Sequence, residues 1–185
     1  MANKIQRART PHAPQHARFG GGRQPPHRTQ NDLPAETRTN VAALCNARLA
    51  DTMDLMHQAK QAHWNVKGRN FIALHELFDT IAAASIEWMD LIGERVVQLG
   101  GLAEGTIQAT AGRTELEEYP LHAAHEREHV AAVSAALAAY GKRVRQAIDQ
   151  ADELGDKDTA DIFTEVSRGV DKNLWFVEAH QQADD

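Results

Sequence analysis

One long stretch limits what this chain can fold into more than any other feature. Residues 69–101 read "RNFIALHELFDTIAAASIEWMDLIGERVVQLGG" and predict a helix over roughly residues 70–99, ended by the pair Gly100 and Gly101. Aromatic residues make up 5% of the chain, Ala and Leu are abundant, and runs of strand-forming residues are scarce. The sequence therefore predicts an all-α protein whose helices are each about 40 Å long.

Three more long helices are predicted around this one. The first follows "NDLPAETRTN" and ends near Gly68, so a very short connection joins it to the helix over residues 70–99 as an antiparallel hairpin. Residues 102–120 lack a sustained period and are predicted to hold one short helix. Further long helices are expected over roughly 121–154 and from about 158. This pattern predicts a four-helix bundle with one long crossover, as in ferritin-like folds.

Charge divides the chain into two parts. Residues 1–30 carry six basic and no acidic residues, a charge of +6, whereas residues 31–185 carry −12. The first part is rich in Pro, Gly, Gln and His and lacks apolar periodicity. We therefore predict a disordered basic tail over residues 1–32 and one folded domain over residues 33–185.

Cysteine content and hydropathy bear on the compartment. The single cysteine, Cys45, excludes an internal disulfide and favours a reducing compartment. No stretch is long and apolar enough to cross a membrane, and the N-terminus lacks the apolar core of a secretory signal. We expect a cytoplasmic protein that makes no membrane contact.

Two pairs of metal-ligand residue types share one face of the helix over residues 70–99. His75 and Asp79 are four residues apart, as are Asp90 and Glu94, so each pair lies on a common face. The two pairs are about 16 Å apart along the helix axis and cannot bind one metal ion within one chain. They are, however, symmetric about a midpoint within "AAAS", residues 82–85, whose small side chains would permit a close approach.

This symmetry predicts a site shared by two chains. If the helix packs antiparallel on its own copy across a two-fold axis, His75 and Asp79 of one chain face Asp90 and Glu94 of the other. The hairpin places His63 level with His75. Two imidazoles and three carboxylates suit Fe²⁺ and Fe³⁺ and indicate redox chemistry. The alternative is that these are ordinary core histidines and solvated charge pairs.

At these residues the sequence resembles the Dps family of mini-ferritins, the DNA-binding proteins from starved cells. The resemblance runs from about residue 38 to 182 and is carried by "HWNVKGRNFIALHELFD", "DLIGERVVQLGG", "GTIQAT", "YPLH" and "GDKDTADIFTEVSRGVDKNLWFVEAH". It implies a hollow homododecameric shell with ferroxidase centres at two-fold interfaces. Such a shell oxidises Fe²⁺, typically with hydrogen peroxide, stores ferric iron and suppresses hydroxyl-radical formation. The family's ligand positions match His63, His75, Asp79, Asp90 and Glu94.

The resemblance implies further roles around the iron. Trp64 matches a tryptophan near the iron that absorbs stray oxidising equivalents, with a core aromatic as the alternative. Acidic residues at the junction of the last two helices match a pore that concentrates Fe²⁺. Lys157 departs from that pattern, and a solvated turn is the alternative. The pore candidates are Glu153, Asp156, Asp158 and Asp161. Zinc and manganese are expected as competing ions.

The segment "HEREH", residues 125–129, fits the zinc-peptidase pattern H-E-x-x-H. No strand accompanies it, and Ala132 and Ala135 stand where the extended pattern requires Gly and His, so peptidase activity is not expected. On the predicted helix the segment contributes to an i, i+3, i+4, i+7 row that could form an auxiliary metal site, with a solvated helix face as the alternative. That row comprises His122, His125, Glu126 and His129.

The basic tail is the predicted DNA contact. Its side chains would neutralise phosphates without reading sequence, and a shell would present many copies; a solubilising tail is the alternative. These side chains are Lys4, Arg7, Arg9, Arg18, Arg23 and Arg28. The sequence therefore predicts an iron-storing ferroxidase associated with the nucleoid that protects DNA. The competing interpretation is a DNA-compacting protein in which metal binding is secondary.

Overall fold

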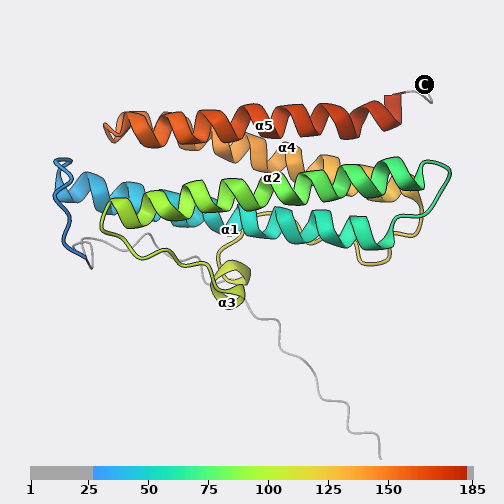
Figure 1. Cartoon of the computed structure of the whole chain (residues 1–185), viewed down its shortest axis with the longest axis horizontal. Coiled ribbons are helices and arrows are strands. Elements are labelled where there is room, and N and C mark those ends of the chain that lie inside the picture. Colours follow the sequence, from blue (N-terminus) through green and yellow to red (C-terminus); the bar gives the residue numbers. More distant parts are fainter. Residues whose placement is uncertain (1–26, 183–185) are drawn as a thin grey trace, which may run out of the picture.

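Four long helices make up most of the described chain. The computed structural model describes residues 27–182. Its long helices are α1 (Ala35–Asn65), α2 (Phe71–Gln98), α4 (Glu126–Glu153) and α5 (Lys157–Gln182), and the short helix α3 is Ile107–Ala111. The α1/α2 pair lies alongside the α4/α5 pair, and no strand occurs within the described residues (Figure 1). The prediction of an all-α, ferritin-like bundle is confirmed.

The hydrophobic core lies between the two helix pairs. Each long helix contributes large side chains that are fully buried, among them Leu55, Phe78, Tyr140 and Phe163. Cys45 also lies in this core, where burial raises the pKa of its thiol to about 12. The thiol therefore stays protonated and acts as an apolar side chain.

Helix α4 begins later than the sequence predicts. His125 is its N-cap in an extended conformation, and the Glu128 carboxylate accepts hydrogen bonds from the N–H groups of Ala124 (2.6 Å) and His125 (3.0 Å). These bonds satisfy N–H groups that a helix end leaves unpaired. Residues 121–125 therefore precede the helix, and the predicted start at 121 is wrong.

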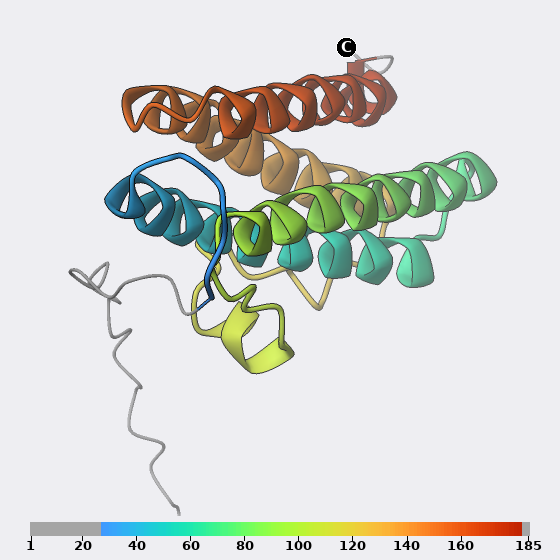
Figure 2. The same ribbon diagram turned by 60° about the vertical axis from the view of Figure 1, so that its left-hand side comes forward.

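The long crossover is the segment between α2 and α4 that contains α3. Polar side chains of α1 hold it in place. Asn46 donates to the carbonyl of Leu102 (3.0 Å) and accepts from the N–H of Glu104 (2.9 Å). Further along α1, Gln58 donates to the carbonyl of Glu117 (2.9 Å). Because a crossover of irregular backbone must find hydrogen-bond partners, these side chains decide its path. The crossover and α3 lie on the side of α1 that faces away from α5 (Figure 2).

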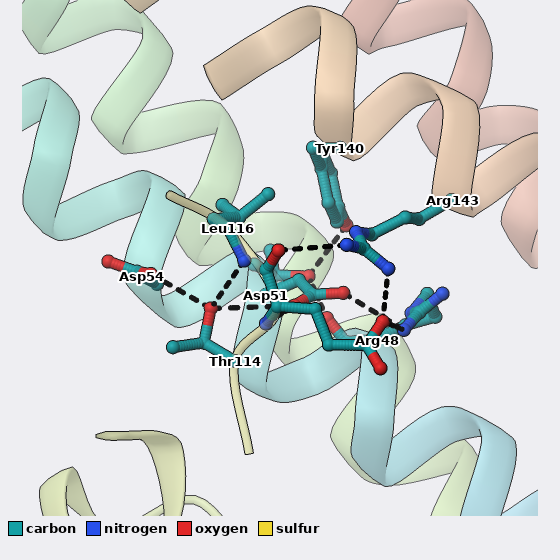
Figure 3. Close-up of polar contacts among 9 residues, drawn as sticks. Arg48, Asp51, Asp54, Thr114, Leu116, Tyr140 and Arg143 are labelled. Carbon is teal, nitrogen blue, oxygen red and sulfur yellow. Dashed lines mark hydrogen bonds and ion pairs between the residues drawn. The ribbon is translucent and has the colours of Figure 1, made fainter. Parts of the chain in front are cut away.

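An ion network built on a buried Arg48–Asp51 pair fastens the middle of the crossover (Figure 3). Asp51 is fully buried on α1, accepts from the N–H of Glu115 (2.8 Å) and lies 3.0 Å from the Arg48 guanidinium. Burial raises the pKa of Asp51, and the charge of Arg48 opposes that rise. Arg143 of α4 pairs with the Glu115 carboxylate and also donates to the Glu115 carbonyl (2.8 Å). The network thus joins α1, the crossover and α4.

The N-terminal segment enters the bundle beside the end of α2. The His27 N–H donates to the carbonyl of Gly100 (3.1 Å), and the Thr29 hydroxyl donates to the carbonyl of Gln98 (3.5 Å). Residues 1–26, most of the predicted disordered tail, lie outside the described residues. Within the described part, none of the helices combines the length and apolar character that a membrane crossing requires.

A buried ion pair joins α2 to the start of α5. The Arg95 guanidinium lies 2.7 Å from the Asp156 carboxylate, with both side chains less than a tenth exposed. Asp156 also accepts hydrogen bonds from the hydroxyl (2.6 Å) and N–H (3.2 Å) of Thr159. The proposal that Asp156 lines a pore is therefore wrong for this chain, because its carboxylate is turned into the bundle.

We expect Asp156→Asn to lower the free energy of unfolding by about 3 kcal/mol, because it removes the only buried carboxylate that pairs with Arg95 among the described residues. The exposed carboxylate of Asp158, 3.8 Å from the guanidinium, is a poor replacement. The matched control is Asp171→Asn, which breaks the exposed Arg145–Asp171 pair (2.9 Å) and should cost less than about 1 kcal/mol. Guanidinium denaturation at equal protein concentration measures both. Equal losses in the two variants would contradict a special role for the buried pair.

Candidate metal centre

His63 and His75 meet across the α1–α2 hairpin. Their rings stack with centroids 3.7 Å apart and planes 20° from parallel. The Nδ1 atom of His63 lies 2.7 Å from the His75 carbonyl oxygen, and Nδ1 of His75 lies 2.9 Å from the His63 carbonyl oxygen. The predicted level placement of the two histidines is therefore observed, and it is held by reciprocal hydrogen bonds between side chain and backbone.

These reciprocal bonds determine where each imidazole carries its proton. A carbonyl oxygen only accepts, so Nδ1 must be the donor in both rings. In the neutral tautomer the lone pair is then on Nε2, the atom left to bind a metal ion. Metal-binding histidines commonly donate their other N–H to a backbone carbonyl in this way. The hairpin thus presents two oriented nitrogen ligands.

Asp79 lies one turn beyond His75 and already has a cationic partner. Lys60 Nζ lies 2.6 Å from Asp79 Oδ1. The hydrogen bond from Lys60 holds the pKa of Asp79 below its usual range, and the charge of Lys60 and of the two histidines adds to this effect. The carboxylate is therefore ionised and exposed, and a metal ion arriving there would compete with the lysine ammonium for it.

The other two candidate ligands lie further along α2 on its exposed face. Asp90 and Glu94 are both exposed to solvent. Within residues 27–182, no group of three or more His, Cys, Asp or Glu side chains lies close enough to hold a metal ion in one chain. A single chain therefore supplies only part of such a centre, and the remaining ligands would have to come from elsewhere.

The outward face of α2 is apolar between its charged residues. Ile72, Ile86 and Val97 are each more than half exposed. At the predicted crossing point, Ala82 and Ser85 are instead buried in their own bundle, with the Ser85 hydroxyl donating to the Ile81 carbonyl (2.9 Å). Of the four small residues predicted to permit a close approach, Ala82 and Ser85 therefore lie inside the bundle and do not face outward. Ala83 and Ile86 are the exposed positions there.

Trp64 points away from the core. Its side chain is 67% exposed, and Lys60 Nζ lies 5.7 Å from its ring centroid. This exposure excludes a place in the core of its own chain. Trp64 thus remains next to His63 as an oxidisable group with a cation near its ring.

The "HEREH" segment serves the hairpin rather than an auxiliary metal site. Glu126 accepts hydrogen bonds from the N–H (3.0 Å) and the side-chain amide (3.3 Å) of Asn70 in the α1–α2 turn. His129 is buried and hydrogen-bonded to Tyr119 (2.6 Å). His122 and His125 precede α4, so the predicted helical row of His122, His125, Glu126 and His129 does not form. The auxiliary-site prediction is wrong.

The remaining pore candidates lie around the α4–α5 junction. Glu153, Asp158 and Asp161 are exposed, whereas Lys157 pairs with Asp152. Lys157 is therefore partly neutralised within its own chain. The pore assignment of the three exposed acids stays a prediction.

Sequence reasoning missed Lys60 and assigned Glu126 to an auxiliary metal site instead of to the α1–α2 turn. Lys60 lies three residues before His63, a spacing that places both on one face of α1. That signal was available for Lys60. The contact between Glu126 and Asn70 joins residues 56 positions apart and has no local signature.

Gly68 and Glu126 should prove energetically coupled. A Cβ atom at residue 68 would lie 2.1 Å from the Glu126 carboxylate, and the Gly68 φ is +154°. We expect Gly68→Ala to cost about 2 kcal/mol and Glu126→Ala about 1 kcal/mol. The double variant should lose less than the two combined, because the clash disappears.

The control for this cycle is Gly155→Ala, since Gly155 has a φ of +83° but no atom within 4 Å of its would-be Cβ. Its cost should be the same whether or not the chain also carries Glu126→Ala. Urea denaturation of the five variants measures the cycle. Strict additivity of Gly68→Ala and Glu126→Ala would show that the carboxylate does not clamp the turn.

Comparisons with known proteins agree with this fold. Residues 42–185 match the family described as a ferritin-like domain. A "DNA protection during starvation protein" from Agrobacterium fabrum is 47% identical over 156 residues, which cover 84% of this chain and 96% of that protein. Another of the same name, from Brevibacillus brevis, is 31% identical and covers 75% of this chain and 93% of its own length.

Solved structures give the same result. Dps from Microbacterium arborescens in the high iron form is 33% identical, with a TM-score of 0.75 over 80% of this chain and 97% of that chain. DpsA14 from Streptomyces coelicolor is 29% identical, with a TM-score of 0.80 over 85% and 93%. The matches cover at least three quarters of this chain and more than nine tenths of each relative, so this chain belongs to the Dps family of mini-ferritins, iron-sequestering proteins that protect DNA.

Proposed function

We propose that two copies of this chain form a pair of ferroxidase centres. Each centre takes His63, His75 and Asp79 from one copy, with Asp90 and Glu94 from the other. The observation that carries the proposal is the pair of reciprocal hydrogen bonds between His63 and His75, which leaves both Nε2 lone pairs free.

The outward face of α2 supports the two-fold arrangement. When α2 packs antiparallel on its copy about the point between Ala84 and Ser85, the exposed Ile72 faces the exposed Val97. The same symmetry places Ile86 against the small Ala83. Apolar side chains therefore meet apolar side chains at both ends and at the middle of the contact. The two halves of the centre come together in the same register.

The ligand set suits iron as a substrate. Imidazole nitrogens and carboxylate oxygens bind Fe²⁺, and added carboxylate charge stabilises Fe³⁺. Hydrogen peroxide accepts one electron from each of two Fe²⁺ ions and, with two protons, leaves as two water molecules. Displacement of Lys60 from Asp79 accompanies metal arrival, and zinc and manganese compete for the same donors. The relative solved in a high iron form supports iron as the cargo.

We further propose that these dimers assemble as a homododecameric shell in the cytoplasm, as in the family. Exposed acids at the α4–α5 junction, Glu153, Asp158 and Asp161, would attract Fe²⁺ to its pores. Ferric iron would then be held inside the shell, away from DNA. Storage of this kind removes both Fe²⁺ and peroxide, the two sources of hydroxyl radical.

A mixed assembly tests the shared centre. We expect His63→Ala and Asp90→Ala each to abolish most peroxide-driven Fe²⁺ oxidation. Co-assembled one to one, they should recover about a quarter of the wild-type rate, because half of the dimers are mixed and each has one intact centre. Stopped-flow absorbance of ferric iron measures the rate.

The matched control is a mixture of His63→Ala with Asp79→Ala. Both residues belong to the same half of the centre, so every mixed dimer then has two damaged centres. This mixture should stay inactive. Recovery in both mixtures, or in neither, would refute the division of ligands between the two copies.

We propose that the basic tail makes the contact with DNA. The body of the protein carries −12 and would repel phosphates, whereas residues 1–30 carry +6. Many tails on one shell add their weak contacts through multivalency. The basic residues Lys4, Arg7, Arg9, Arg18 and Arg23 lie outside the described residues, and Arg28 lies within them. Nucleoid association would follow from this contact.

We expect a chain that starts at His27 to lose DNA retardation in gels at low salt. This boundary keeps the hydrogen bond from His27 to Gly100. The matched control keeps the full length and replaces the five basic residues before His27 by Gln, so that charge is separated from length. It should lose binding equally. Retardation that survives the Gln replacements, or that ignores salt, would contradict the electrostatic contact.

A further inference from the structure

A tyrosine and a histidine outside the candidate metal centre form a short hydrogen bond. The Tyr119 hydroxyl oxygen lies 2.6 Å from Nδ1 of His129, and the two rings stack with centroids 6.2 Å apart. Tyr119 belongs to the crossover and is half-buried, whereas His129 lies in the first turn of α4 and is 1% exposed. The contact therefore joins a partly accessible phenol to a fully enclosed base.

The surroundings favour the phenol as the donor of this hydrogen bond. Burial lowers the pKa of His129, opposed by the Glu128 carboxylate and the Asn65 carbonyl, and burial raises the pKa of Tyr119 to about 12. Both groups are therefore neutral near pH 7. The Asn65 carbonyl lies near the His129 ring, although Nε2 has no hydrogen bond of normal geometry within the described residues. A proton on Nε2 leaves the Nδ1 lone pair to accept from the phenol.

Small oxidants can reach the phenol. Tyr119 lines a cavity of about 600 Å³ between α1 and the crossover, together with polar side chains that include His57 and Gln61. Asn65, whose carbonyl lies near the His129 ring, is two residues after His63 and next to Trp64. The pair thus lies behind the end of α1 that carries a proposed iron ligand.

The second tyrosine of the chain has a different partner. Tyr140 is fully buried, and its hydroxyl lies 2.6 Å from the Thr52 hydroxyl. Thr52 donates its own proton to the carbonyl of Arg48 (2.7 Å), so it accepts from Tyr140. Neither a hydroxyl nor a backbone carbonyl can take up a proton near neutral pH. The chain contains two tyrosines, and only Tyr119 faces a base.

We propose that Tyr119 and His129 form a redox-active pair that captures one-electron oxidants formed from Fe²⁺ and peroxide. When hydroxyl radical removes one electron from Tyr119, the phenolic proton moves to Nδ1 of His129. The products are hydroxide, a neutral tyrosyl radical and an imidazolium ion. Without the base, the half-buried phenol would become a radical cation or lose its proton to water, which is a far weaker base than imidazole. The short hydrogen bond supplies an acceptor already in place.

Fe²⁺ then reduces the oxidised pair to its starting state. One Fe²⁺ ion donates an electron to the tyrosyl radical, the imidazolium returns its proton to the phenolate oxygen, and Fe³⁺ remains. One hydroxyl radical is thereby converted to hydroxide at the expense of one Fe²⁺ ion. The physiological oxidant rests on the proposed iron chemistry, but the redox activity of the pair does not.

The test generates the oxidant with light instead of iron. The assembled, iron-free protein is oxidised by a flash-quenched ruthenium polypyridyl complex, and the radical is frozen and read by electron paramagnetic resonance. A tyrosyl signal should appear in wild-type protein and in Tyr140→Phe, and should be absent in Tyr119→Phe. A tyrosyl signal that persists in Tyr119→Phe would overturn the proposal. A tryptophanyl signal in place of the tyrosyl signal in wild-type protein would overturn it as well.

The role of the base is tested by His129→Asn. Its amide oxygen offers a hydrogen-bond acceptor near the place of Nδ1 but cannot take up a proton. The tyrosyl yield should fall at least about tenfold, with helix content and assembly size unchanged by circular dichroism and gel filtration. If the variant fails to assemble, His129→Gln is used in its place. An undiminished yield in a folded variant would refute proton transfer to His129.

A second measurement connects the pair to iron. With Fe²⁺ and peroxide, spin trapping should detect several-fold more hydroxyl radical from Tyr119→Phe than from Tyr140→Phe. If both variants release equal amounts of trapped hydroxyl radical while wild-type protein still gives the tyrosyl signal under light, the protective role is rejected and the redox activity of the pair stands. If wild-type protein does not oxidise Fe²⁺ with peroxide, that result counts against the proposed ferroxidase, whatever the flash experiment shows.

Discussion

The short turn between α1 and α2 is the constraint on which the rest of the candidate centre depends. α1 ends at Asn65 and α2 begins at Phe71, so little slack separates the two helices. The turn alone does not fix their rotation. The buried apolar side chains of the two helices fix it together with the hydrogen bonds in which His63 and His75 each donate to the backbone of the other. The same bonds that align the helices also orient the imidazoles, so fold and ligand geometry cannot vary independently.

The crossover shows how an irregular segment is held without a core of its own. Asn46, Asp51 and Gln58 lie along α1 and each bonds to the backbone of the crossover. Their side chains replace the hydrogen bonds that a regular element would make for itself. Because the crossover is fixed in this way, Tyr119 is brought to a defined place beside α4. A segment without regular secondary structure can therefore hold a side chain in a fixed position relative to a helix.

Much of the fold could be predicted because its signals are local. The apolar period of the helices, the Gly pair that ends α2 and the spacing of His75 from Asp79 are all properties of short windows. The start of α4 was placed wrongly because the Glu128 carboxylate competes for the N–H groups of residues 124 and 125. The apolar period of a sequence contains no information about that competition.

The rest of the region depends on contacts between distant residues. Asp156 looks like a surface acid in sequence, yet it is buried against Arg95, 61 positions away. His129 belongs to a motif typical of metal sites, yet its partner is a phenol from the crossover. In both cases the residue type suggested one function and the tertiary partner assigned another. Such partners follow from packing, which single-sequence patterns do not contain.

The pairing of Lys60 with Asp79 bears on the order of events in the life of the protein. Three carboxylates brought together from two acidic chains would repel one another while no metal is bound. A lysine that neutralises one of them acts as a resident counterion in the empty centre. In the proposed dimer, the contact between copies would then need no iron to form. Synthesis of the empty shell and its later filling would be separate steps, so a cell could accumulate the protein before iron is released.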